Sequence, residues 1–222
     1  MEVTAPTPPP PTAKTRSFLR DIVETAIVAI LIYLLIHSTV LNFVVEGSSM
    51  QPTLQSGDRI LVNRNAYGTF DLGDLVDWLP FVPDQHWFTI IDWGEPERGD
   101  VIVLTPLPPG EQKAHIKRVI GLPGDHVQII AGEVIVNGTV LDEEYIGDFQ
   151  NTCNGGGSFA ICDVVVPEDS VFVMGDHRND SADSRYFDVV PYERIIGKAW
   201  LVYWPVDAFG MIRHPDYPEL TP

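Results

Sequence analysis

A serine and a lysine that could act together in peptide chemistry lie in two short segments of distinctive composition. The first segment is GSSMQPTL at residues 47–54, a Gly/Ser turn with two adjacent hydroxyls, Ser48 and Ser49. The second is HIKRVIGLPGD at residues 115–125, where Lys117 lies in an apolar run that ends in a Pro-Gly-Asp turn. A serine hydroxyl attacks a carbonyl when a base removes its proton, and a neutral lysine amine can be that base. Each segment alone is also typical of ordinary structure, a loop serine and a surface lysine.

Lysine can act as a base only in a special environment. Its reference pKa of about 10.4 must fall by several units, and burial can shift the pKa of such a group by up to roughly 3–5 units. Each unit costs about 1.4 kcal/mol, which an apolar pocket must supply by favouring the neutral amine. Ile116 and Val119 give Lys117 apolar neighbours. Arg118 cannot take this role, because a guanidinium does not lose its proton in proteins.

A third polar segment is GDHRNDSADSR at residues 175–185, which follows an apolar run and could alone be a solvated turn. It does not have the pattern of a calcium loop, because Arg178 stands where a ligand oxygen is needed and no central glycine follows. Ser49 lacks the G-x-S-x-G elbow of an α/β-hydrolase. We expect no metal and no cofactor.

An apolar segment precedes the serines and could position them at a membrane. A helix over residues 22–40 would be roughly 28 Å long, close to the thickness of a bilayer core. A buried helix would show a polar stripe, and a cleavable signal peptide would be followed promptly by a small-x-small site. Neither pattern is present, so we predict a retained transmembrane anchor over residues 18–41.

The flanks of this anchor predict its orientation. Residues 1–17 are rich in proline and are expected to form a disordered tail. Basic residues precede the anchor, and the positive-inside rule therefore keeps the tail in the cytoplasm and exports the rest: Lys14, Arg16 and Arg20. The connection from Val40 to Ser49 spans at most about 30 Å, so Ser49 is expected near the outer membrane face.

The exported part, residues 42–222, is predicted to be an all-β domain with an antiparallel sheet. Its apolar runs are short, β-branched and separated by turn residues, with hairpins expected at Ala131-Gly132 and Asn137-Gly138. Residues 68–97, which contain scattered tryptophans and phenylalanines, and residues 148–162 are predicted to be inserted loops. The aromatic insertion could form an interfacial patch or pack on its own domain.

Net charge and cysteine spacing argue against two classes of ligand, nucleic acid and zinc. The net charge of −17 argues against nucleic acid, whose phosphates need a basic face. The two cysteines, Cys153 and Cys162, lack the spacing of zinc ligands. A disulfide between them would require an oxidising compartment, and the sequence leaves its formation open.

Together these segments resemble type I signal peptidases, also called leader peptidases. SMQPTL at residues 49–54 matches the nucleophile box of that family, and RGDVIV at residues 98–103 matches its next strand box. KRVIGLPGD at residues 117–125 matches the lysine box, and residues 175–185 match the last box. The four boxes occur in family order within residues 18–205.

The resemblance implies specific roles. Ser49, chosen over Ser48 by the Ser-Met-x-Pro register, would be the nucleophile and Lys117 the general base. Ser181 would hydrogen-bond to the lysine amine and orient it, while Asp183 and Arg185 would pair and brace the site. The backbone N–H of Ser49 would bind the oxyanion. Gly47 stands where some members have a serine, which leaves the second oxyanion donor open.

The implied substrate is a signal peptide of an exported preprotein, cut after a small-x-small site. It would add as a strand between residues 43–47 and 112–117, with shallow pockets for small side chains. Contacts with substrate are expected from five residues: Val45, Gly47, Met50, Pro52 and Ile116. Membrane lipid is the second expected partner.

Two alternatives compete with this interpretation. A self-cleaving repressor shares Ser/Lys chemistry, but residues 1–20 cannot form the DNA-binding module that it needs. A catalytically inactive, membrane-tethered β-domain that binds exported proteins would not need Ser49 and Lys117, and their presence argues against it.

Overall fold

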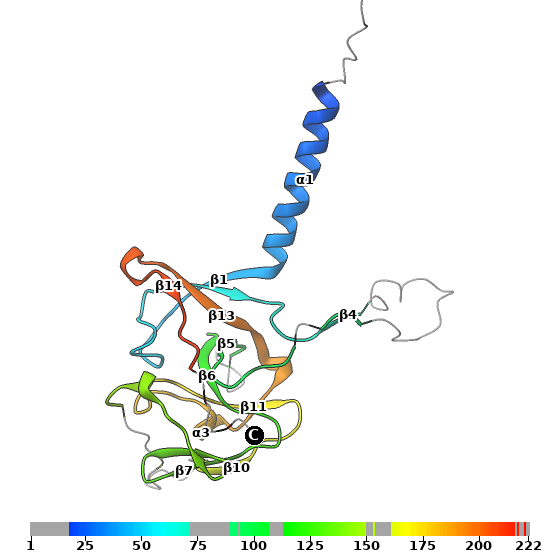
Figure 1. The fold of residues 1–222 in the computed structure, drawn as a ribbon. Coiled ribbons are helices and arrows are strands. Elements are labelled where there is room, and N and C mark those ends of the chain that lie inside the picture. Colours follow the sequence, from blue (N-terminus) through cyan, green and yellow to red (C-terminus); the bar gives the residue numbers. More distant parts are fainter. Residues whose placement is uncertain are drawn as a thin grey trace, which may run out of the picture. The chain divides into compact units, whose positions relative to one another are not determined.

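The computed structural model describes residues 18–71, 89–92, 94–106, 113–149, 153, 161–215, 217 and 220. The chain divides into two compact units, Met1–Ser38 and Thr39–Pro222 (Figure 1). The predicted tail of residues 1–17 lies outside the described residues.

The long helix α1 (Phe18–Thr39) lies in the first unit except for its last residue, Thr39. Within the part of the chain that the structure describes, its segment Arg20–Thr39, with a mean hydropathy of 2.0, is the one helix whose length and composition would suit a membrane span. The helix ends before the predicted boundary at residue 41, because Val40 and Leu41 pair with Asn63 and Val62 in a sheet.

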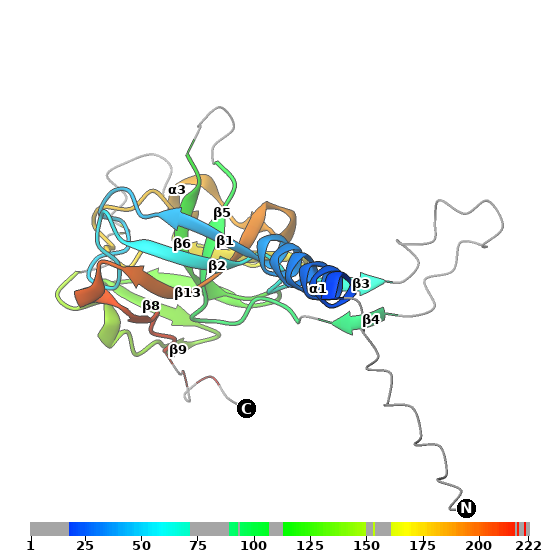
Figure 2. The same ribbon diagram turned by 90° about the horizontal axis from the view of Figure 1, so that it is seen from above.

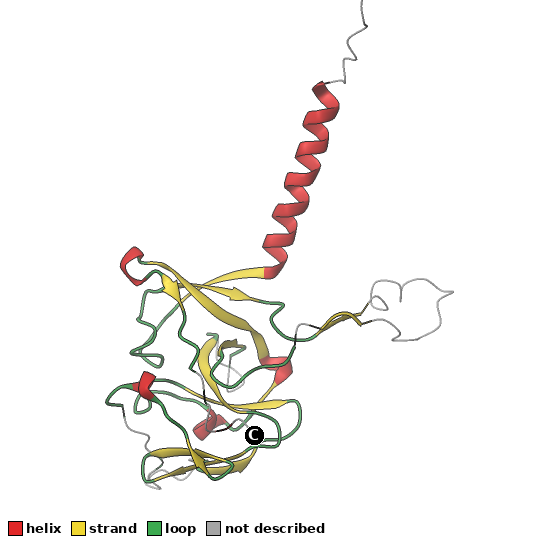
Figure 3. Ribbon diagram, viewed as in Figure 1, coloured by secondary structure: helices red, strands yellow, loops and turns green. Residues whose placement is uncertain are grey.

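The second unit is built on an eight-stranded antiparallel sheet, which confirms the predicted fold class (Figure 3). The order across the sheet is β1 (Val40–Val44), β2 (Arg59–Asn63), β13 (Ile195–Trp204), β5 (Val101–Leu104), β6 (His115–Gly121), β11 (Ser170–Met174) and β12 (Val190–Pro191). The short strand β14 (Gly210–Met211) pairs with β13. These strands are rich in valine and isoleucine, whose branched side chains suit a pleated surface.

A smaller four-stranded sheet has the order β10 (Asp163–Val165), β7 (His126–Ile130), β8 (Glu133–Val136) and β9 (Thr139–Val140). Both predicted hairpins are present here, one between β7 and β8 and the other between β8 and β9. Asn137 and Gly138 have φ angles of 53° and 83°, the left-handed conformation that a two-residue hairpin turn requires.

The predicted insertion at residues 68–97 begins and ends as a β-hairpin rather than a loop. Strands β3 (Thr69–Asp71) and β4 (Thr89–Asp92) pair antiparallel (Figure 2). Residues 72–88 and 93, which include its tryptophans, lie outside the described residues. The remaining helices of the second unit are short: η1 (Glu144–Ile146), α3 (Ser184–Phe187), η2 (Tyr192–Arg194) and η3 (Val206–Ala208).

One of the apolar clusters lies under the segment that carries the serines. Met50 and Leu54 are each 1% exposed and pack with Ile60 and Val62 of β2 and Val103 of β5. Burying two large apolar side chains contributes roughly 1.5–3 kcal/mol each. These two buried side chains therefore hold the Gly/Ser turn against the sheet.

Candidate active site

The turn that carries Ser49 follows β1 directly and is closed by its own backbone. The Gln51 N–H donates to the Ser48 carbonyl at 2.9 Å, and the Leu54 N–H donates to the Met50 carbonyl at 2.9 Å. Gly47 has a φ of 90°, which favours glycine and lets the chain leave the strand sharply. Because Met50 is buried below, the preceding residue, Ser49, is held at the surface of the sheet.

Lys117 reaches this turn from β6. Its side chain is almost fully buried, with the whole residue 2% exposed, and its Nζ lies 3.0 Å from Ser49 Oγ. The same Nζ donates to the Ile116 carbonyl at 2.9 Å. The hydroxyl of Ser48 instead donates to the carboxylate of Asp180. The two adjacent serines thus have different partners, and Ser49 is the one beside the lysine.

The polar loop after β11 packs directly on the Ser49 backbone. The His177 N–H donates to the Ser49 carbonyl at 3.0 Å. A Cβ on Gly175 would lie 2.4 Å from the Ser49 carbonyl oxygen and 2.3 Å from Ser181 Oγ. Only glycine fits in this contact. The loop therefore approaches the serine turn closely at a position where any side chain would collide.

The expected hydrogen bond between Ser181 and Lys117 is not formed in the structure. Ser181 Oγ is buried and has no hydrogen-bond partner among the described residues. It lies beside Gly175 and the Ser49 carbonyl instead. The loop therefore brings Ser181 to the serine turn with its hydrogen-bonding capacity unused.

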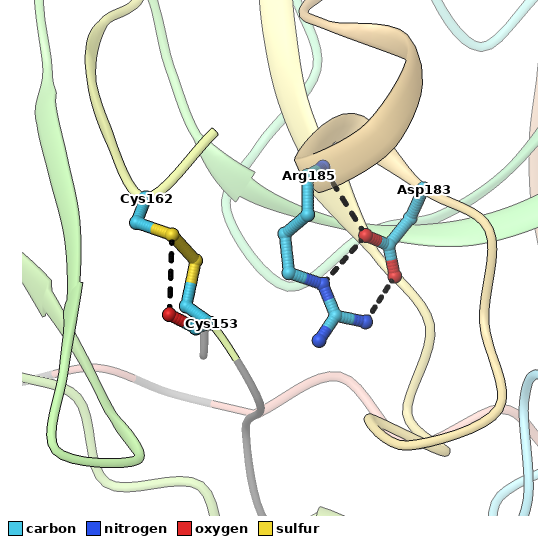
Figure 4. Close-up of a disulfide and its surroundings, with 4 residues drawn as sticks. All are labelled: Cys153, Cys162, Asp183 and Arg185. Carbon is cyan, nitrogen blue, oxygen red and sulfur yellow. Dashed lines mark hydrogen bonds and ion pairs between the residues drawn. A yellow bond between two sulfur atoms is a disulfide. The ribbon is translucent and has the colours of Figure 1, made fainter. Parts of the chain in front are cut away.

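Asp183 and Arg185 do pair, and both side chains are completely buried (Figure 4). Arg185 Nε and Nη2 each donate to a carboxylate oxygen of Asp183 at 2.8 Å. The same carboxylate accepts the Gly175 N–H at 3.0 Å and the Arg185 N–H at the start of α3. Asp183 thus joins the close-contact glycine to the helix that follows the loop.

A disulfide lies next to this pair, as Figure 4 shows. Cys153 and Cys162 are bonded, with their Cα atoms 5.9 Å apart. The adjacent Ile161 N–H donates to the Arg185 carbonyl at 2.7 Å. The disulfide that the sequence left open is therefore formed, and Ile161 beside it is hydrogen-bonded to Arg185. Of the predicted insertion at residues 148–162, residues 150–152 and 154–160 lie outside the described residues.

Sequence inspection missed a second buried ion pair, between Arg118 and Asp176. Arg118 Nε and Nη2 donate to the two Asp176 oxygens at 2.8 and 2.7 Å, and the Thr53 hydroxyl donates to the same carboxylate at 2.5 Å. Burial works against the charge, but Asp176 raises the pKa of Arg118, so the guanidinium stays protonated. Thr53 belongs to the serine turn, Arg118 follows Lys117, and Asp176 belongs to the polar loop. The pair therefore joins all three segments.

A third buried arginine, Arg178, connects the polar loop to Glu143. Arg178 is 1% exposed and forms a two-pronged contact with the Glu143 carboxylate. Its Nε donates to the Gly175 carbonyl at 3.1 Å. No sequence motif marked Glu143, which is 35 residues from Arg178 in the chain.

A groove of about 390 Å³ opens beside Ser49 and Lys117. Its lining comes from β1 and the residues after it, from β6 and the residues before it, and from β2 and β5: Phe43, Val44, Val45, Glu46, Ser49, Ile60, Val103, Lys113, Ala114, His115, Ile116 and Lys117. Of the five expected substrate contacts, Val45 and Ile116 line this groove.

The other three expected contacts do not line the groove. Met50 is 1% exposed in the core, because its apolar side chain anchors the serine turn. Pro52 faces a separate hollow beside Thr53 and Tyr145. Gly47 precedes the serines with open space where its Cβ would be.

Among the described residues, the set nearest to a metal site is Glu97, Asp100 and His214. Lys198 Nζ already lies 2.5 Å from Asp100 Oδ1 and supplies the compensating positive charge. The donor set is therefore an internal ion pair, and we assign no metal to it.

Comparison with known proteins tests the expected family membership. A family model described as "Signal peptidase, peptidase S26" matches residues 19–204. The chain belongs to the signal peptidase S26 family. The expected family membership is thereby confirmed, and the match includes both the serine turn and the polar loop.

Relatives within the signal peptidase family cover most of this chain. A probable signal peptidase I-2 from Synechocystis is 36% identical over 76% of this chain, which spans 65% of the length of that relative. A signal peptidase I from Bacillus caldolyticus is 34% identical over 76% of this chain and 82% of its own length. A solved signal peptidase I from Enterococcus faecalis is 30% identical and covers 47% of this chain and 96% of its own, with a TM-score of 0.38.

Proposed function

We propose that this chain is a serine endopeptidase that removes N-terminal signal peptides from exported preproteins after small-x-small sites. The observation that carries the proposal is the buried Lys117 amine, 3.0 Å from Ser49 Oγ, with both residues lining an open groove. Family membership supports the same substrate class.

In the proposed reaction, Ser49 Oγ attacks the scissile carbonyl carbon while its proton passes to Lys117 Nζ. The backbone N–H of Ser49 stabilises the oxyanion. The C–N bond then breaks, and Lys117 returns the proton to the leaving amine. Water, deprotonated by the same amine, then attacks the carbonyl carbon of the resulting ester. The bond from this carbon to Ser49 Oγ breaks, Lys117 returns the proton to Oγ, and the signal peptide leaves with a free carboxyl group.

This chemistry requires the neutral lysine amine, and the surroundings of Lys117 support it. Removal from water disfavours the ammonium form, and Lys117 is 2% exposed. The nearby Arg118 keeps its positive charge in the pair with Asp176 and does not compete as a base. Ser181 is proposed to orient the amine, because its buried hydroxyl has unused hydrogen-bonding capacity.

The proposed substrate binds as an extended strand in the groove. Strand β1 is the edge of the large sheet, and β11 pairs with β6 only from Arg118 onward, where Arg118 lies opposite Met174. Strand addition at such edges is a common mode of peptide recognition. Val45 and Ile116 would contact small substrate side chains.

The anchor fits a location at the cytoplasmic membrane. We propose that α1 spans the bilayer once, in contact with lipid, with the N-terminus in the cytoplasm and the second unit on the outer face. The basic residues before the helix support this orientation.

The proposal is tested with the full chain in membranes and a secretory precursor. Ser49→Ala and Lys117→Ala are each expected to lower processing by roughly 10⁴-fold or more. Lys117→Arg should be equally inactive, because it keeps the charge but cannot act as a base. Ser48→Ala is the matched control and should keep activity within about tenfold, since its hydroxyl contacts Asp180. Normal processing by Lys117→Ala protein would refute the dyad.

A further inference from the structure

An exposed ion pair spans the groove that contains the candidate catalytic residues. Lys113 Nζ contacts the Glu46 carboxylate, with the two side chains 79% and 63% exposed. Both residues line the groove. Glu46 follows β1, and Lys113 precedes β6.

The two ends of this ion pair come from strands that are not neighbours. Between β1 and β6 the sheet order places β2, β13 and β5. The groove floor includes Ile60 of β2 and Val103 of β5, so β1 and β6 form its two walls. A contact between Glu46 and Lys113 therefore crosses from one wall to the other, above an apolar floor.

A peptide strand that enters between the walls meets this contact. The lining residues on the two sides are 43–46 and 113–117, which are the edges proposed to pair with substrate. A strand that hydrogen-bonds to both edges separates Glu46 from Lys113. Both charges then return to water, since each is already largely exposed.

We propose that the Glu46–Lys113 ion pair is a latch across the groove, which the substrate strand must open in order to bind. This inference rests on the proposed function for the identity of the substrate. The latch disfavours binding without touching the reacting atoms, so Glu46 and Lys113 are expected to change the affinity for substrate rather than the chemical step.

The exposure of the Glu46–Lys113 ion pair sets how much the latch can weaken peptide binding. The Glu46 carboxylate raises the pKa of the Lys113 amine by a hydrogen bond and by its charge, so the amine stays protonated at neutral pH. Exposed ion pairs are weak and are screened by salt. Removing the latch should therefore lower the peptide Kd by about two- to fivefold.

The test uses the full-length chain in detergent and a neutral peptide that contains an Ala-x-Ala site. Peptide Kd is measured in the Ser49→Ala background, and KM and kcat are measured with Ser49 present. Glu46→Gln and Lys113→Gln are each expected to lower Kd and KM by about two- to fivefold. The double variant Glu46→Lys with Lys113→Glu restores an ion pair and should return Kd to the original value.

A matched control is Glu144→Gln, which breaks an exposed ion pair with Arg213 outside the groove. It should leave Kd unchanged. High salt should lower Kd for the original chain and have a smaller effect on Glu46→Gln. Unchanged or raised Kd in both single variants would overturn the latch, as would a swapped variant that behaves like the single variants.

Failure of the proposed function has a different signature. If the chain with Ser49 present never cuts the peptide, signal peptide cleavage is refuted, while the Kd series in the Ser49→Ala background still decides the latch. If the chain cuts the peptide and the Kd series is flat, the latch alone is refuted.

Discussion

Gly175→Ala should disable the candidate site through a single added methyl group. Gly175 lies where the polar loop comes closest to the serine turn. A Cβ added at this position would lie 2.4 Å from the Ser49 carbonyl oxygen. It would also lie 2.3 Å from Ser181 Oγ and 2.6 Å from Ser181 Cβ. Contacts this short cannot persist, so the serine turn or the loop must move.

The size of the effect follows from these contacts. Overpacking a well-packed site costs about 1–3 kcal/mol, which corresponds to a fall of roughly 2–12 °C in Tm for a domain of this size. Activity should suffer more, because a displacement of about 1 Å at a reacting group can cost roughly 10²-fold in rate. We therefore expect kcat/KM to fall by about 10²-fold in protein that is still folded at the assay temperature.

The assay compares kcat/KM for an Ala-x-Ala peptide with the thermal unfolding curve of the same protein. Gly197→Ala is the matched control, because its Cβ would lie 2.3 Å from the Asn63 carbonyl oxygen on β2 rather than near Ser49. It should lose similar stability and keep most of its activity. Equal activity losses in both variants, or full activity in Gly175→Ala, would refute the proposed dependence of the serine on this contact.

Two further predictions concern buried carboxylates. Asp176→Asn leaves the buried Arg118 without its counter-charge and should lower the free energy of unfolding by about 3–5 kcal/mol. Denaturant titration measures this loss, with Asp163→Asn at an exposed position as the control. A loss no larger than that of the control would contradict the prediction. The second prediction concerns the contribution of Asp100 to stability in acid. Burial opposes ionisation of Asp100, yet hydrogen bonds from His214, Lys198 and Tyr67 lower its pKa to about 2. Because this pKa lies below the unfolded value of 3.8, Asp100 stabilises the fold above about pH 4, and that stability is lost as the pH falls towards 2. Asp100→Asn should flatten the fall in Tm between about pH 5 and 2, and parallel Tm curves would count against this assignment.

Much of the fold was predictable because it depends on neighbouring residues. The Asn137-Gly138 hairpin follows from two residues that tolerate positive φ, and the strands follow from short β-branched runs. The apolar composition of α1 is likewise local. The pairing of β3 with β4 within residues 68–97 was not predicted, because it joins segments that are separated by 17 residues in the chain.

The candidate site divides along the same line. The sequence by itself determined that a serine and a lysine were available, that Arg118 could not be the base, and that the ordered boxes resemble those of signal peptidases. The Ser-Met-x-Pro register had already selected Ser49 over Ser48, and the tertiary structure gives the two hydroxyls different partners, Lys117 for Ser49 and Asp180 for Ser48. Tertiary structure also placed Met50 in the core, where the sequence had predicted a contact with substrate.

The long-range contacts that connect the site belong to tertiary structure as well. Arg118 and Asp176 are 58 residues apart, and Ser49 and Lys117 are 68 residues apart. Such partners meet only when the register of non-neighbouring strands is set, and a local pattern of residues carries no record of that register. The sequence therefore specifies the chemistry that is available, and packing of the β-sheet specifies which groups meet.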